Sequence, residues 1–237
     1  MFVPNRSSDY HGTVVPSLHP DFKQFPIPSG ERQLILLPYA AMTSNTVSDI
    51  PLLRGPVPLS RLFVRCFVSE GDRVVDATCG NGHDTLALAE RTGSNGRVWG
   101  FDIQEQSIAE TGRRLSEAGL ADRVTLVHAG HEEMAQHLNG PVKLVLFNLG
   151  YLPGGDRRVI TRPATTGIAL DQTLKLLAVG GIVIVTVYPG HEGGGAEQKS
   201  VDDWANALDP REYHSWRMGQ VNVVSDAPYT LLVQKAA

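Results

Sequence analysis

The chain has 237 residues, of which 42% are hydrophobic, and its formal net charge at pH 7 is −4. This size suits one α/β domain, alone or with an appendage, and the acidic balance argues against a general polyanion binder while leaving room for a local basic patch. No apolar run approaches the ~20 residues of a membrane span, so we predict no membrane partner. Cys66 and Cys79 make no disulfide framework and indicate a reducing, cytoplasmic setting.

Residues 1–55 differ from the rest because they are dense in Pro and Ser around one apolar patch, "RQLILLPYAAM". We predict an N-terminal arm here, partly disordered or packed on the domain that follows over residues 56–237. The start lacks the basic and apolar regions of a signal peptide. The arm has few Arg and several acids, which disfavours a transit peptide but leaves organellar targeting open.

From Pro56 onward, strands and helices are predicted to alternate. The predicted helices span residues 58–67, 84–92, 105–120, 132–138, 163–181 and 196–208. The predicted strands span residues 72–78, 96–102, 123–129, 143–148, 182–190, 213–222 and 229–235. This alternation indicates a doubly wound, mostly parallel α/β sheet, and the last two strands, with no helix between them, indicate one antiparallel strand near the C-terminus. Ligands of such sheets bind beyond the carboxyl ends of the strands.

The first strand end, "DATCGNGHDT", carries Gly80 and Gly82 on either side of Asn81. Glycines between a strand and a helix let the backbone approach a ligand closely. The dinucleotide fingerprint has a third glycine where this chain has Thr85. Asp76 precedes the turn, and an acid there suits the ammonium of S-adenosylmethionine better than a pyrophosphate. The turn therefore favours S-adenosylmethionine over NAD.

The second strand ends at Asp102, about twenty residues after the glycine turn, where a carboxylate can hold a ribose diol. We predict S-adenosylmethionine as the cofactor, bound by Asp76, Gly80, Asn81, Gly82, Asp84, Thr85, Asp102, Gln104, Gly130, His131 and Asn148. The structural alternative is that the acids cap helices and the glycines only make turns. A metal site is not predicted, because no further Cys or His completes a zinc pattern around His128 and His131.

The fourth strand runs into "NLGYLPGGD", which resembles the Asn-Pro-Pro-Tyr motif of amino-methyltransferases. The Asn148 side-chain oxygen and the Leu149 carbonyl can hold an amine for in-line attack on a methyl group, and the Tyr151 ring can hold a nucleobase or an ammonium. The alternative is a strand end capped by an Asn beside a buried Tyr.

Five motifs in order, "DATCGNGHDT", "GFDIQ", "HAGHEEM", "FNLGYLPGGD" and "YPGHEGG", resemble the YtqB/MnmM-like family of class I S-adenosylmethionine-dependent methyltransferases. The resemblance runs from about Pro56 to the C-terminus. It implies a Rossmann-like fold, and N-methylation of the 5-aminomethyl group of wobble uridine 34 in tRNA, usually 2-thiolated.

Such an amine is mostly protonated in water, and His191 or Glu192, after the fifth strand, could receive its proton. Asp156 is a further candidate beside the substrate. The cationic residues that follow it, Arg157, Arg158 and Arg162, are predicted to contact the anticodon loop. The alternatives are that the His-Glu pair orders a glycine-rich loop and that the arginines form a solvated loop.

Three other functions stay open. The first is a methyltransferase that acts on rRNA or a small-molecule amine, which the glycine turn does not exclude. The second is an NAD-binding reductase, against which Thr85 and Asp76 weigh. The third is a non-catalytic RNA-binding module, which has no need of Asn148 and Tyr151 as an amine clamp. A homodimer is an open alternative for the assembly.

Overall fold

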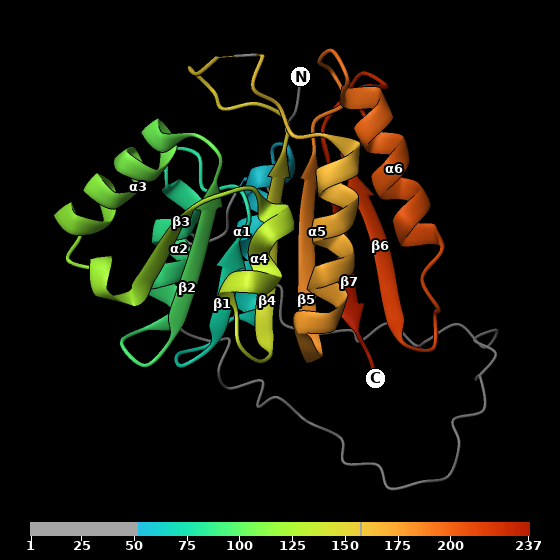
Figure 1. Ribbon diagram of the computed structural model, residues 1–237. Helices are drawn as coiled ribbons and strands as arrows, with labels where there is room; N and C mark the ends of the chain where they lie inside the picture. Colours follow the sequence, from blue (N-terminus) through green and yellow to red (C-terminus); the bar gives the residue numbers. More distant parts are fainter. Residues whose placement is uncertain (1–51, 157) are drawn as a thin grey trace, which may run out of the picture. The chain divides into compact units, whose positions relative to one another are not determined.

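In the computed structural model, residues 52–156 and 158–237 are described. Seven strands in this part of the chain form one sheet in the order β3-β2-β1-β4-β5-β7-β6 (Figure 1). The strands are β1 Arg73–Asp76, β2 Arg97–Asp102, β3 Val124–His128, β4 Val142–Leu149, β5 Leu177–Val187, β6 Tyr213–Gly219 and β7 Tyr229–Lys235. The predicted arm, except for its last four residues, lies outside the described residues.

The sheet is parallel except at its C-terminal end. Strands β3, β2, β1, β4 and β5 pair in parallel, and β7 runs antiparallel to both β5 and β6. The predicted doubly wound α/β sheet with one antiparallel strand near the C-terminus is therefore confirmed.

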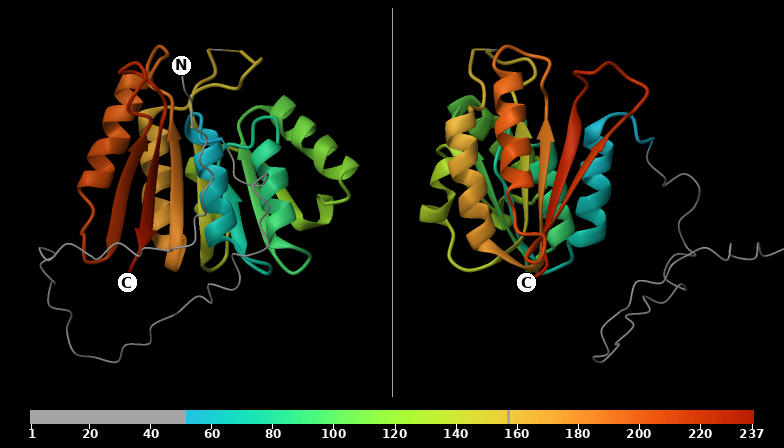
Figure 2. Two further views of the ribbon diagram at one scale, coloured as in Figure 1. Left: turned by 180° about the vertical axis from the view of Figure 1, so that it is seen from behind. Right: turned by 90° about the vertical axis from the view of Figure 1, so that its right-hand side faces the viewer.

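Helices cover both faces of the sheet, as the front view of Figure 1 and the rear and side views of Figure 2 show. The α-helices are α1 Pro56–Phe67, α2 His83–Thr92, α3 Glu105–Glu117, α4 Met134–His137, α5 Pro163–Leu176 and α6 Gly194–Asn206, and two short 3-10 helices span Ala121–Arg123 and His131–Glu133. One layer holds α1, α2 and α3, and the other holds α4, α5 and α6. Among the described residues, no helix is long and apolar enough to cross a membrane.

The central strands send alternate side chains into the two helix layers. In β4, Val145 and Phe147 pack with residues of α4, α5 and α6, whereas Leu144 and Leu146 pack with residues of α1, α2 and α3. All four side chains are at most 1% exposed. A strand buried on both faces is a continuous apolar run in the sequence, which is why "LVLF" predicts a core strand without alternation.

The predicted helix over residues 163–181 is wrong at its C-terminal end. Helix α5 stops at Leu176, and the next residues, up to Gly181, begin β5 beside β4. The pairing register between the two strands shifts near Val142, where β5 enters the sheet. The apolar "LKLLAV" run suits either state, so only the pairing with β4 ends the helix here. A side chain at Gly181 would lie 2.8 Å from the Ala178 carbonyl oxygen and 2.9 Å from that of Lys143, so this glycine permits the close approach of two strands.

Gly181→Ala is therefore expected to lower the free energy of unfolding by ~1–3 kcal/mol, the range for an overpacked site. Gly167→Ala is the matched control, because it lies inside α5 and its new methyl group would meet nothing within 4 Å. It should raise the free energy of unfolding by ~0.5–1 kcal/mol, since alanine favours a helix more than glycine does. Denaturant titration of both variants tests the pair, and equal stabilities would contradict the strand assignment.

Candidate active site

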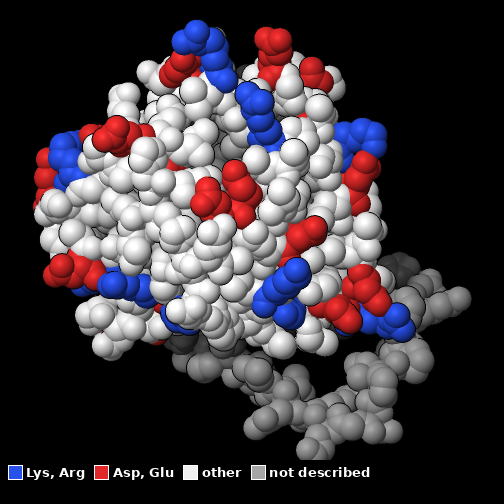
Figure 3. All heavy atoms as spheres, in the orientation of Figure 1, with Lys and Arg blue, Asp and Glu red and all other residues white. Residues whose placement is uncertain are grey.

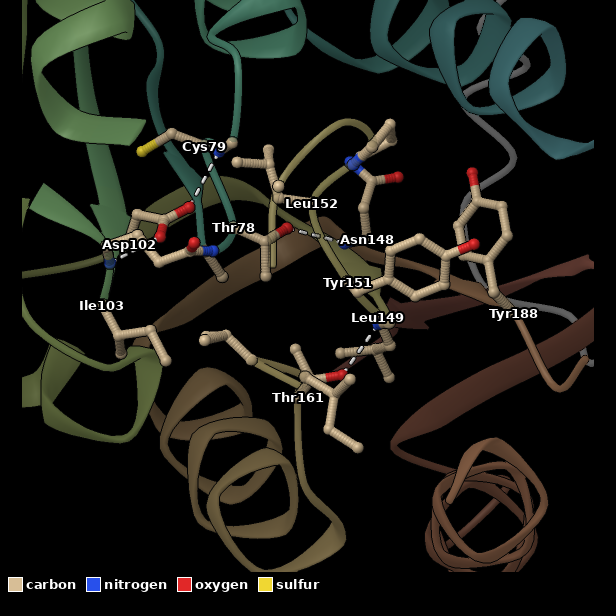
Figure 4. Close-up of a pocket in the computed structure, with 18 of the residues that line it drawn as sticks. Thr78, Cys79, Asp102, Ile103, Asn148, Leu149, Tyr151, Leu152, Thr161 and Tyr188 are labelled. Atoms are coloured by element: carbon tan, nitrogen blue, oxygen red, sulfur yellow. Dashed lines mark hydrogen bonds between the residues drawn. The ribbon is translucent and has the colours of Figure 1, made fainter. Parts of the chain in front are cut away.

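A cavity of about 910 Å³ lies at the carboxyl ends of the parallel strands (Figure 4). Its walls come from the turn after β1, the ends of β2, β4 and β5, the loop after β3, helix α1 and the β6–β7 connection. The predicted site residues that line it are Gly80, Asn81, Asp84, Asp102, Gln104, Gly130, His131, Asn148, Leu149, Tyr151, Arg162 and His191. Segments distant in the sequence thus converge, because parallel strands end at one edge of the sheet.

Other predicted site residues lie off the cavity wall, namely Asp76, Gly82, Thr85, Asp156, Arg158 and Glu192. Gly82 begins α2 with a positive φ of 77°, and a side chain there would lie 2.8 Å from the Thr111 hydroxyl oxygen. The absence of a side chain at Gly82 therefore lets the start of α2 pack closely against α3. Glu192 is exposed on the loop after β5. Arg157 lies outside the described residues.

Asp76, predicted as a cofactor contact, lies buried beneath the glycine turn and does not line the cavity. Its two carboxylate oxygens accept hydrogen bonds from the Thr85 hydroxyl at 2.6 Å and from the Thr78 N–H at 3.2 Å. Burial, and then the nearby charge of Asp84, raise the pKa of Asp76 to about 7. Asp76 therefore holds the turn to the first turn of α2.

Asp102 is fixed by backbone N–H groups at the end of β2. Its Oδ2 accepts from the Gly80 N–H and its Oδ1 from the Gln104 N–H, each at 2.9 Å (Figure 4). A carboxylate has about four lone-pair positions, so two remain for hydroxyl donors. Gly80 has a φ of 53°, and a side chain there would lie 3.0 Å from Leu152. The turn thus keeps an open backbone beside an oriented carboxylate, a pair that can hold a nucleoside sugar.

Asn148, at the end of β4, is held through both its backbone and its side chain. Its backbone N–H donates to the Thr78 hydroxyl at 2.8 Å, and its side-chain Nδ2 donates to Asp84 Oδ2 at 3.0 Å. Arg61 of α1 donates to the other oxygen of Asp84 from both Nε and Nη2, at 3.2 Å each. The Asp84 side chain is 16% exposed, so this ion pair is partly shielded from water. Asp84, predicted as a cofactor ligand, therefore acts on Asn148 in the structure.

The bond from Asn148 Nδ2 to a carboxylate decides which way the amide points, since a carboxylate can only accept. The amide oxygen Oδ1 then faces away from Asp84, is buried, and has no hydrogen-bond partner among the described residues. A buried acceptor without a donor costs ~1–3 kcal/mol. A ligand that donates an N–H here would recover that energy.

Two aromatic residues stand beside this acceptor. Figure 4 shows Tyr151 and Tyr188 on the Asn148 side of the cavity, away from Asp102. The Tyr151 ring lies edge-on to the His191 ring, with 5.8 Å between centroids. Burial, and then the charge of Asp84, raise the pKa of Tyr188, so its hydroxyl stays neutral near pH 7. The cavity thus has a sugar-binding end and an end that combines amide, imidazole and aromatic groups.

The loop after β4 is closed at its base by a buried carboxylate. Gly150 and Thr161 pair through the Gly150 N–H to the Thr161 hydroxyl at 2.8 Å and the Thr161 N–H to the Gly150 carbonyl at 2.9 Å. Thr161 and Thr166 donate their hydroxyls to Glu197 of α6 at 2.6 and 2.7 Å. Glu197 is only 2% exposed. It therefore fixes the point at which the chain leaves β4 and returns to α5.

The predicted cationic patch is only partly on the cavity. Arg158 forms an exposed ion pair with Asp156, with Nη2 2.7 Å from Oδ2, and Arg158 lowers the pKa of that carboxyl to about 2. Arg162 lines the cavity. Figure 3 shows basic and acidic side chains interspersed over the face that carries α4, α5 and α6, without a broad surface of one sign. Among the described residues, the Lys and Arg side chains on the cavity wall are Arg61 and Arg162.

Sequence reasoning missed several residues that build the site, namely Arg61, Thr78, Thr161, Tyr188 and Glu197. Thr78 and Tyr188 follow strands directly, and the rule on strand ends that singled out Asp102 could have found them. Arg61 and Glu197 lie within helices, and Thr161 ends a loop. No local signal in the sequence marks these three.

A family model described as "Putative rRNA methylase" matches residues 98–234 of the chain. Among curated relatives, the chain is 39% identical over 151 residues to "tRNA (mnm(5)s(2)U34)-methyltransferase, chloroplastic" of Arabidopsis thaliana, which covers 60% of this chain and 55% of that protein. It is 27% identical over 119 residues to the tRNA 5-carboxymethoxyuridine methyltransferase of Escherichia coli (strain K12), covering 50% of this chain and 41% of that protein. The chain thus spans about half the length of these curated relatives.

Solved structures show the same fold. A "putative rRNA-methylase" of Clostridium thermocellum is 42% identical, with a TM-score of 0.76 over 78% of this chain and 100% of that one. SMU.1697c of Streptococcus mutans, a "putative methyltransferase" in complex with SAH (S-adenosylhomocysteine), is 30% identical, with a TM-score of 0.70 over 78% of this chain and 99% of that one. The fold is that of class I methyltransferases.

The buried Asp76 gives a prediction on stability. Its pKa rises from 3.8 in a free chain to about 7 in the fold, so the unfolded state loses the proton first as the pH rises. The folded state is therefore progressively destabilised between about pH 4 and pH 7. Asp76→Asn removes this titration, and the amide can still accept from the Thr78 N–H and donate to the Thr85 hydroxyl. Its free energy of unfolding at pH 7 should exceed that of wild type by up to about 4 kcal/mol.

The measurement is denaturant unfolding at pH 4 and pH 7. The stability difference between variant and wild type should be small at pH 4 and larger at pH 7. The same difference at both pH values would mean that Asp76 titrates normally.

Proposed function

Since this chain belongs to the "Putative rRNA methylase" family, we propose that it is an S-adenosylmethionine-dependent methyltransferase that N-methylates the 5-aminomethyl group of wobble uridine 34 in tRNA. The product carries 5-methylaminomethyl. The proposed methyltransferase domain spans residues 56–237. The observation that carries the proposal is Asn148 Oδ1, which has no hydrogen-bond partner within residues 52–156 and 158–237, at one end of a cavity whose other end holds Asp102.

Two findings support S-adenosylmethionine as the cofactor. The Asp102 carboxylate is fixed by two backbone N–H groups and keeps lone pairs for a ribose diol. The S. mutans protein, described as a "putative methyltransferase" and 30% identical over 78% of this chain, was solved in complex with SAH. When bound, S-adenosylmethionine supplies an electrophilic methyl group on a sulfonium. Asp102, Gly80 and the loop at Gly130 are the proposed cofactor contacts, and Asp76 supports them from below.

Two points support tRNA as the substrate. The Arabidopsis relative is named as a wobble-uridine methyltransferase, and the end of β4 offers hydrogen-bond acceptors to an amine. Asn148 Oδ1 and the Leu149 carbonyl can each accept an N–H from a primary amine, which leaves the nitrogen lone pair free for attack. Tyr151 offers its ring to the uracil or to the developing ammonium. Arg162, on the cavity wall, is the proposed contact to an anticodon-loop phosphate.

The direct test of the function is nucleoside mass spectrometry. Transcripts or cellular tRNA that carry 5-aminomethyl-2-thiouridine are incubated with the protein and S-adenosylmethionine, and rRNA is run in parallel. A gain of one methyl group on the wobble nucleoside is expected. Methylation of rRNA alone, or of no RNA, would contradict the proposal.

Asp102→Ala should weaken the binding of S-adenosylhomocysteine by at least about tenfold, since hydrogen bonds to a charged group contribute ~1.5–3 kcal/mol. Asp122→Ala, on the short helix after α3, removes a carboxylate outside the cavity and serves as the matched control. Isothermal titration calorimetry measures both. Binding of NAD without any response to S-adenosylhomocysteine would overturn the cofactor assignment.

Asn148→Ala should leave the affinity for S-adenosylhomocysteine within a few-fold of wild type but cut methylation by at least ~100-fold, because a placed acceptor leaves the reacting centre. Asp84→Asn keeps Asn148 but lets its amide turn over, and kcat should fall by about tenfold with little change in the KM for tRNA. Single-turnover methylation assays measure both effects. Near-normal turnover of Asn148→Ala would show that Asn148 does not hold the amine.

A further inference from the structure

His191, in the loop after β5, holds one ring nitrogen ready to accept a proton. Its Nδ1 lies 2.8 Å from the backbone carbonyl oxygen of Glu192. A carbonyl oxygen only accepts hydrogen bonds, so Nδ1 carries the hydrogen of the neutral ring and Nε2 carries the lone pair. Nε2 is buried and has no hydrogen-bond partner within the described part of the chain. The backbone thus fixes a tautomer whose free lone pair is shielded from water.

This lone pair lies beside the amine-binding end of the cavity. A side chain built on Gly150 would lie 3.5 Å from His191 Nε2 and 3.6 Å from the Tyr188 Cβ atom. Gly150 stands between Leu149 and Tyr151, and the Tyr151 ring meets the imidazole edge-on. A donor bound by Asn148 Oδ1 and the Leu149 carbonyl is therefore a near neighbour of Nε2.

We propose that His191 is the catalytic base, which takes a proton through Nε2 from the substrate's aminomethyl ammonium. This inference rests on the proposed function. The transferred proton leaves a neutral primary amine, whose nitrogen lone pair then forms the new N–C bond. The electrons of the breaking C–S bond go to sulfur, so the sulfonium becomes a thioether and the product leaves as a secondary ammonium. The imidazolium returns its proton to water.

The acids that bond to Asn148 or are predicted beside the substrate are less suited to take this proton. Both oxygens of Asp84 accept hydrogen bonds, one from Arg61 and one from Asn148. Asp156 is ion-paired with Arg158, and neither lines the cavity. Glu192 is exposed and off the cavity wall, so of the two predicted proton acceptors the geometry favours His191.

His131 also has a buried Nε2 without a partner among the residues that the structure describes, but it lies near Asp102, whose charge acts on it. It follows β3 and packs edge-on against Phe147, with 5.6 Å between ring centroids. Burial lowers the pKa of His131, which disfavours its protonated form. It therefore serves the proposed cofactor end and not the amine.

The pH dependence of the reaction tests the base. The titratable groups on the elements around His191 are Tyr151, Tyr188, Asp84, Asp226, Arg61 and Arg162, with Glu192 in its own loop and Glu197 buried below. In His191→Asn, the amide N–H can still donate to the Glu192 carbonyl, but the basic lone pair is lost. The single-turnover rate near pH 7 should fall by ~10²–10⁴-fold. The deficit should shrink as the pH rises toward the pKa of a free amine, where the substrate loses its proton to water.

His214→Asn is the matched control, since His214 is exposed on β6 and does not line the cavity. It should show the wild-type profile. His191→Gln provides a second variant, and an affinity for S-adenosylhomocysteine within a few-fold of wild type shows that each variant is folded.

Each outcome decides between the two proposals. A wild-type pH profile for folded His191→Asn, or a deficit of the same size at every pH, overturns the base assignment while the function stands. A wild-type protein that does not methylate aminomethyl-uridine tRNA at any pH overturns both.

Discussion

The hydrogen bond from Asn148 Nδ2 to Asp84 is the contact on which the arrangement of this site depends. An amide can point either way at similar cost, and a partner that only accepts or only donates hydrogen bonds decides between the two orientations. Asp84 is such a partner, and two hydrogen bonds from Arg61 hold its carboxylate in place. Helix α1 therefore takes part in the site through a bridge to the end of β4. Without this bridge, the cavity would present an amide N–H₂ as readily as an oxygen.

Buried carboxylates stabilise the loops around that contact. Asp76 ties the glycine turn to α2, and Glu197 ties the base of the loop after β4 to α6. Each is satisfied by neutral donors, which is a costly way to bury an acid. These bonds fix the turn that carries Gly80 and the chain around Gly150 from the protein interior. The opposite side of both segments lines the cavity. Of the acids that the sequence marks as cofactor contacts, Asp76 thus supports the turn from within the fold, and Asp102 remains on the cavity wall as a proposed contact.

The sequence predicts the elements and the edge of the sheet where ligands bind, because buried parallel strands are continuous apolar runs and all end on one side. It places Asp102 and Asn148 correctly on the cavity by that rule alone. It does not distinguish Asp76, which is buried below the glycine turn, from residues on the cavity wall, because burial depends on how α2 packs. It also misses Arg61 and Glu197, which reach their partners across distances of 23 and 36 residues along the chain. The end of α5 is decided by pairing with β4, which no local window contains.

Two buried polar atoms at the site share one property that limits which substrates could accept the methyl group. Asn148 Oδ1 and His191 Nε2 are both buried without a hydrogen-bond partner in the described part of the chain. Asp84 orients the amide, and the Glu192 carbonyl selects the tautomer of a neutral imidazole with its lone pair on Nε2. A carboxylate or a carbonyl ligand would place acceptor against acceptor and add repulsion to an existing desolvation cost. An ammonium brings three N–H groups, enough for these two atoms and the Leu149 carbonyl together. In the proposed reaction, loss of one proton to His191 leaves two donors for the two oxygens, and the freed lone pair is the nucleophile. The proposed substrate would thus match these acceptors as an ammonium on binding and as a neutral amine at the moment of transfer.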